Sequence, residues 1–128
     1  MTVEQQVIAT ILEMEERIEA GERRAFMEYI GEDFTAQNGS MNRDQLRAFV
    51  LLQLNRYKQL QGQLFPIHVE DGGDGQAAAW FRALVTGGPG WLPESGQMFE
   101  FETHWRLIDG EWLLQEANWD PVPLDEVL

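Results

Sequence analysis

The Asp109-Gly110 dipeptide is the feature that most restricts how this chain can fold. Asp-Gly favours a two-residue type I′ turn, whose twist matches that of an antiparallel hairpin. The runs on either side of it, 97–108 and 111–119, alternate apolar and polar residues as half-buried strands do. A turn of this length places residue 108 opposite residue 111 and thereby fixes every further cross-strand pair. The sequence therefore predicts an antiparallel hairpin with one buried face.

The segment before Leu60 has the periodicity of helices, and the segment after it has that of strands. Helices are predicted over 3–20 and 22–30, and a third begins at Asn42. The inward face of the first helix combines apolar residues with one acid: Val7, Ile8, Ile11, Leu12, Glu15 and Ile18. Further strands are predicted at 63–70 and 76–86. The expected structure is a single α+β domain over residues 1–128, with three N-terminal helices packed on a mostly antiparallel sheet.

The turn also determines which residues of the last strand face the core. Counting from residue 108 opposite residue 111, the buried side carries Trp112, Leu114, Glu116 and Asn118. A buried carboxylate is costly unless it is paired, protonated or in a wet cavity. Glu116 is therefore the candidate catalytic residue, as a general acid or base. A hydrogen bond to a neighbouring backbone group, or a place at the wet mouth of a cavity, would explain the same residue without catalysis.

The charge of the chain excludes some classes of partner. It has 22 acidic and 9 basic residues, a formal net charge of −13. Such a surface repels phosphate backbones and anionic lipids, so neither nucleic acid nor a membrane is expected as a partner. The sequence has no long apolar run, and its N-terminus has no basic start with an apolar signal core, so a cytoplasmic location is expected.

Three segments resemble the nuclear transport factor 2-like, or SnoaL-like, superfamily. They are Ile18-Glu19-Ala20-Gly21-Glu22, Tyr29-Ile30-Gly31-Glu32-Asp33-Phe34 and His104-Trp105-Arg106-Leu107-Ile108-Asp109-Gly110-Glu111-Trp112-Leu113-Leu114. The resemblance covers nearly the whole chain and implies a cystatin-like cone, in which a strongly curved sheet and the helices enclose a pocket. The superfamily includes ketosteroid isomerases, polyketide cyclases, dehydratases, epoxide hydrolases and many proteins with a pocket and no known reaction, so the resemblance implies a fold rather than an activity. Met14, Asn38 and Thr103 stand where the isomerases carry their catalytic groups, so steroid isomerisation is not expected.

The pocket that this resemblance implies has an expected polar floor and apolar walls. Asn38, Thr103 and Asn118 would join Glu116 at the floor and orient a small ligand. The expected apolar contacts are aromatic: Tyr57, Phe81, Phe101, Trp105 and Trp112. To keep apolar residues on one face, Ala79 is expected opposite Trp105.

Neither a metal nor a cofactor is expected. The chain has no cysteine, and its two histidines, His68 and His104, fall on different strands. It also has no glycine-rich phosphate loop followed by a helix.

The outer face of the sheet is expected to carry an apolar patch made of Trp80, Leu84, His104, Leu113 and Trp119. A patch with two tryptophans suggests an interface, and the superfamily often dimerises through this face, so a homodimer is predicted. The loop over 87–96 is either a lid on the pocket or part of that contact.

Three functions remain open from the sequence. The first is a binding domain for a small apolar molecule. The second is a dehydratase, isomerase or hydrolase that uses Glu116 as acid and base. The third is a dimeric interaction module whose pocket is vestigial.

Overall fold

The computed structural model of the protein describes residues 1–57, 60–87 and 95–127. These residues form helices α1 (Val3–Glu19), α2 (Arg23–Met27), α3 (Arg43–Arg56) and α4 (Leu124–Val127). The strands are β1 (Ile30–Ala36), β2 (Met41–Asn42), β3 (Leu60–Leu64), β4 (His68–Gly73), β5 (Gln76–Gly87), β6 (Ser95–Ile108) and β7 (Glu111–Pro121). The predicted α+β class is confirmed, and the short α4 was not predicted.

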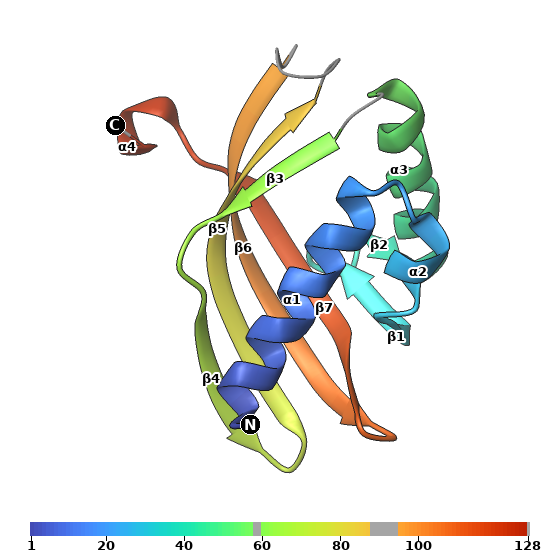
Figure 1. The fold of residues 1–128 in the computed structure, drawn as a ribbon, viewed down its shortest axis with the longest axis vertical. Coiled ribbons are helices and arrows are strands. Elements are labelled where there is room, and N and C mark those ends of the chain that lie inside the picture. Colours follow the sequence, from blue (N-terminus) through green and yellow to red (C-terminus); the bar gives the residue numbers. More distant parts are fainter. Residues whose placement is uncertain (58–59, 88–94, 128) are drawn as a thin grey trace.

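The strands form one curved sheet in the order β2-β1-β7-β6-β5-β3, and β4 also pairs with β5. The pairing of β1 with β7 is parallel, and the other pairings are antiparallel. Helix α1 lies across one face of this sheet, and α2 and α3 lie beside it (Figure 1). We call the face covered by α1 the inner face. Within the described residues, no helix is long and apolar enough to cross a membrane.

Helices α1 and α3 both begin with a capping box, a motif that their sequences allow. At α1, the Gln5 N–H donates to the Thr2 side chain and the Gln5 side chain accepts from the Thr2 N–H. Asn42 and Gln45 make the same reciprocal pair at α3. Helix α2 is shorter than predicted because the chain already enters β1 at Ile30, where β1 pairs with β7.

The hairpin of β6 and β7 follows the prediction only over its first half. Asp109 and Gly110 both have positive φ, 51° and 81°, as a type I′ turn requires. The pairs then run as expected from Ile108 opposite Glu111 to Trp105 opposite Leu114. One extra residue, Gln115, follows in β7, so that the next pair is His104 with Glu116. This β-bulge exchanges the two faces for the rest of β7.

The pairing of β5 with β6 keeps the predicted faces but differs in register by two residues. Ala79 lies opposite Thr103 instead of Trp105, and Phe81 lies opposite Phe101. A shift of two residues leaves each side chain on the same face, so alternation alone could not distinguish the two registers. The observed register stacks the Phe81 and Phe101 rings, with 5.1 Å between centroids and 9° between planes.

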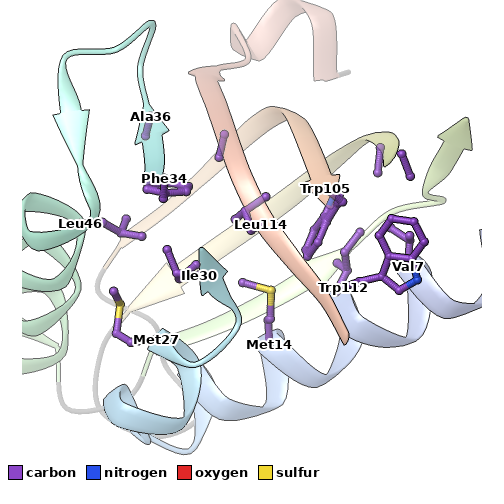
Figure 2. Packing of buried hydrophobic residues seen from close by; sticks show 14 of the residues in the cluster. Val7, Met14, Met27, Ile30, Phe34, Ala36, Leu46, Trp105, Trp112 and Leu114 are labelled. Atoms are coloured by element: carbon purple, nitrogen blue, oxygen red, sulfur yellow. The ribbon is translucent and has the colours of Figure 1, made fainter. Parts of the chain in front are cut away.

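Under the first half of α1, the inner face of the sheet carries a solid core of buried side chains. Val7, Trp105 and Trp112 belong to one buried cluster there (Figure 2). The Trp112 Nε1–H donates to the Gln6 side chain at 2.8 Å, which satisfies the one polar group of that indole. Trp112 is therefore a residue of the solid core.

Candidate functional site

A cavity of about 350 Å³ lies between the second half of α1, α3 and the inner face of the sheet. Side chains from α1, α2, α3, β1, β3, β5, β6 and β7 line it. Interiors are normally close-packed, with few voids larger than a water molecule. A space of this size within the fold is therefore a candidate binding site.

The wall of the cavity is rich in aromatic rings. The lining includes Phe26, Phe34, Phe49, Phe81, Phe99, Phe101, Trp105 and Trp119. Several of these rings touch one another: the Phe101 centroid lies 5.1 Å from that of Phe81 and 6.1 Å from that of Trp119, and Trp119 lies 6.2 Å from Phe49. Together they form a continuous aromatic surface that suits a flat apolar molecule.

Glu15 is the ionisable side chain that lines the cavity within the described part of the chain. It lies on α1 one turn after Ile11 and one turn before Ile18, so helical spacing directs it to the same face as these two residues. Its Cγ is 4.0 Å from the position that a Cβ would take at Gly62 of β3, so its stem packs against that strand. Its Oε2 atom is buried and has no hydrogen-bond partner among the described residues.

The surroundings of Glu15 favour its protonated form. Burial of the carboxyl raises its pKa above the ordinary value, and the negative charges of Glu19 and Glu16 raise it further. Glu19 is held beside it because one of its oxygens accepts the Gly62 N–H at 3.0 Å. The cavity wall thus carries one carboxyl group whose pKa lies above the ordinary value.

This pKa shift predicts a pH dependence of stability. The folded protein binds the Glu15 proton more tightly than the unfolded chain, so the free energy of unfolding should fall as the pH rises above 4.5 and level off above the raised pKa. Glu15→Gln removes this contribution, so the variant should gain stability relative to the wild type across that window. Urea unfolding at a series of pH values measures the difference. Glu116→Gln, with the same change of formal charge, is the control, and an equal gain in both variants would contradict the assignment to Glu15.

Thr103 lines the cavity, but its hydroxyl already acts as a hydrogen-bond donor and as an acceptor within the protein. The hydroxyl donates to the Ala79 carbonyl at 2.8 Å and accepts the Trp105 Nε1–H at 2.8 Å. With the side chain buried, these bonds tie β5 to β6 and orient the indole. Thr103 is therefore a structural part of the wall rather than a free polar group.

Thr103→Val should lower the free energy of unfolding by about 1–3 kcal/mol, because it leaves the buried Trp105 N–H unsatisfied and removes a hydrogen bond to the Ala79 carbonyl. Chemical denaturation measures this loss, with Thr86→Val on the same sheet as the partly exposed control. A stability equal to that of the wild type would show that the hydroxyl does not hold the wall together.

The structure brings some of the sequence-predicted site residues to the cavity and separates the others from it. Phe81, Phe101, Thr103 and Trp105 line it. Tyr57 does not; its ring packs against Gly87 at the end of β5. Trp112 lies in the solid core described above.

The expected orientation of Glu116 and Asn118 is wrong. Because of the bulge at Gln115, Glu116 lies opposite His104 and Asn118 opposite Glu102, on the outer face of the sheet. Asn118 donates to Glu116 at 3.3 Å and accepts the backbone N–H of Asn38 at 2.8 Å. Asn38 itself is exposed in the turn after β1. Three residues of the predicted polar floor, Asn38, Glu116 and Asn118, thus form a hydrogen-bond network outside the cavity.

The same bulge changes the predicted outer patch. Trp119 faces inward and lines the cavity, so it cannot belong to an outer surface. Trp80, Leu84, His104 and Leu113 are partly exposed. Of the predicted loop over 87–96, residues 88–94 lie outside the described part of the chain.

The sequence analysis placed Glu15 on the inward face of the first helix but did not name it as a site residue. An acid on the apolar face of an amphipathic helix is the pattern of a buried titratable group. The second missed signal is Gln115-Glu116, two polar residues in succession after the two leucines Leu113-Leu114. Such a break in alternation within a strand is typical of a bulge.

No protein-family model matches this chain, and no curated protein sequence matches it. Solved structures do resemble it in fold. One is a provisionally assigned dehydratase of the nuclear transport factor 2-like family from Streptomyces avermitilis, with a TM-score of 0.79, 16% identity, and coverage of 93% of this chain and 95% of that one. Another is a nuclear transport factor 2-like protein with a cystatin-like fold from Novosphingobium aromaticivorans, with a TM-score of 0.78, 17% identity, and coverage of 94% and 82%. A provisionally assigned scytalone dehydratase from the same organism has a TM-score of 0.79 at 9% identity, with coverage of 93% and 83%.

These likenesses identify the fold. The chain has the cystatin-like fold of nuclear transport factor 2-like proteins, as its sequence motifs implied. At such low identity they say nothing about which molecule the cavity accepts or whether a reaction takes place there.

Proposed function

We propose that this protein binds a small, largely apolar molecule in the cavity between α1, α3 and the inner face of the sheet. The observation that carries the proposal is the cavity itself, about 350 Å³ in volume and lined almost entirely by apolar side chains. Ligand sites typically have volumes of roughly 300–1,000 Å³, mostly apolar walls and a few polar groups that fix orientation. Glu15 is such a polar group.

The aromatic wall favours a ligand with a flat ring system. The Phe101 ring centroid lies 5.1 Å from that of Phe81 and 6.1 Å from that of Trp119, so the three rings offer adjoining surfaces. A bicyclic aromatic molecule would contact several of these rings without requiring the side chains of the wall to rearrange.

Titration with 2-naphthylmethanol, a neutral bicyclic probe, tests the proposal. Calorimetry should show saturable binding at one site, with a negative heat-capacity change because apolar surface is buried. The melting temperature should rise with probe concentration, since a ligand that binds only the folded state stabilises it by mass action. If saturating probe produces neither binding heat nor a thermal shift, the proposal fails.

An enzyme is the second candidate, and the carboxyl of Glu15 is the observation that favours it. A partly buried acid with a raised pKa in the wall of a cavity is suited to transfer protons to and from a bound substrate. Two of the structures with similar folds are provisionally assigned dehydratases. If a turnover is found, Glu15→Gln should abolish it and Glu116→Gln should leave it unchanged; the reverse result would remove Glu15 as the acid-base group.

The homodimer stays a prediction. Without Trp119, the outer patch consists of Trp80, Leu84, His104 and Leu113. Sedimentation equilibrium distinguishes a dimer from a species of 14.7 kDa.

A further inference from the structure

The cavity is electrostatically suited to a cation. Glu15 contributes a carboxyl group to its lining, and no lysine, arginine or histidine is among the described residues that line it. The faces of aromatic rings carry negative potential and attract cations. The aromatic surface around Phe101 therefore has the same electrostatic preference as the carboxylate. The formal charge of −13 on the whole chain adds a general attraction for positive ligands.

Glu15 is partly buried, and its carboxylate has one oxygen, Oε2, without a hydrogen-bond partner among the described residues. The neighbouring Glu19 adds negative charge instead of compensating it, and accepts the Gly62 N–H. A buried charge is tolerated when it is paired and hydrogen-bonded. A ligand with a positively charged N–H donor would supply the opposite charge and a charge-assisted hydrogen bond to the carboxylate.

From this combination we propose that the cavity accepts an organic ammonium ion with an apolar, preferably aromatic, body. Its ring packs against the wall formed by Phe81, Phe101 and Trp119, and its ammonium group pairs with the Glu15 carboxylate. The proposal rests on the proposed function above, because it specifies the ligand class of the same cavity. A neutral ligand that accepts a hydrogen bond from protonated Glu15 is the alternative that the experiment must separate.

Two probes of the same shape make that separation. 2-Naphthylmethylamine carries an ammonium group where 2-naphthylmethanol carries a hydroxyl, and the ring is identical. In calorimetric titrations near neutral pH, the wild-type protein should bind the amine about tenfold more tightly than the alcohol. In Glu15→Gln the preference should fall to about twofold or less, while the alcohol should still bind, because the aromatic wall is unchanged.

Glu116→Gln is the matched control, since it removes the same formal charge on the outer face of the sheet. It should keep the preference for the amine. If both variants lose the preference equally, the attraction comes from the general surface charge and the inference is overturned. Circular dichroism and the binding of the alcohol show that each variant is folded.

The remaining outcomes separate this inference from the proposed function. Binding of the alcohol as tightly as the amine by the wild type would overturn the ammonium proposal and leave apolar binding intact. Binding of neither probe would overturn both. A preference for the amine that disappears only in Glu15→Gln supports both.

Discussion

Glu15→Leu is expected to stabilise the protein by about 1–2 kcal/mol near pH 7 while it abolishes the preference for an ammonium ligand. Leucine removes a carboxyl whose buried Oε2 atom has no hydrogen-bond partner among the described residues. It also places apolar atoms against the apolar lining of the cavity. Residues that are kept for binding commonly cost stability in the free protein. A gain in stability coupled to a loss in binding would identify Glu15 as a functional residue.

The control for this variant is Glu16→Leu. Glu16 is the next residue of α1 and is exposed, so its replacement should change stability by no more than about 0.5 kcal/mol. Urea denaturation measures both variants. If Glu15→Leu is destabilised, the carboxylate makes a favourable interaction in the free protein, and the view of Glu15 as an unpaired group is wrong.

The second large effect concerns two alanines on the inner face of β5. Ala83 borders the cavity, whereas Ala79 is fully buried in the solid core and is not part of the cavity lining. Ala79→Leu should therefore lower the free energy of unfolding by about 1–3 kcal/mol through overpacking. Ala83→Leu has empty space to occupy and should be neutral or stabilising, because each buried methylene contributes about 0.8 kcal/mol.

Ligand binding gives a second test of Ala83→Leu. Ala83→Leu should weaken 2-naphthylmethanol binding by about tenfold or more, since its side chain occupies volume that the ligand needs. Ala78→Leu, whose side chain lies on the outer face of the same strand, should bind the probe as the wild type does. Equal destabilisation by Ala79→Leu and Ala83→Leu would mean that no usable space exists beside Ala83.

The sequence predicted the fold class well because strong local signals agree with the tertiary structure. Thr2 and Asn42 begin helices through capping boxes that can be recognised within four residues of sequence. The Asp109-Gly110 turn has the positive φ values that its chemistry favours. These features depend on neighbouring residues, and local chemistry is what a single sequence reveals most directly.

The candidate site was predicted less well because it depends on where alternation fails. The turn at Asp109 correctly placed Leu114 inward, but the extra residue Gln115 then placed Glu116 outward. A bulge preserves alternation on each side of it, so the two halves of β7 look regular when read separately. Conversely, Glu15 was placed correctly on the inner face of the first helix, but nothing in the sequence showed that the cavity lies beside that part of the helix.

Ligand-induced shifts of the tryptophan indole N–H resonances test the central claim most directly, because they report where a probe binds. Trp105 and Trp119 line the inner cavity, whereas Trp80 lines a groove on the outer face with Phe65 and Arg82. On titration with 2-naphthylmethanol, we expect the Trp105 and Trp119 signals to shift with a common saturation curve while the Trp80 signal stays in place. A shift of Trp80 with Trp105 and Trp119 unchanged would contradict the account, because the probe would then occupy the outer groove and leave the cavity empty.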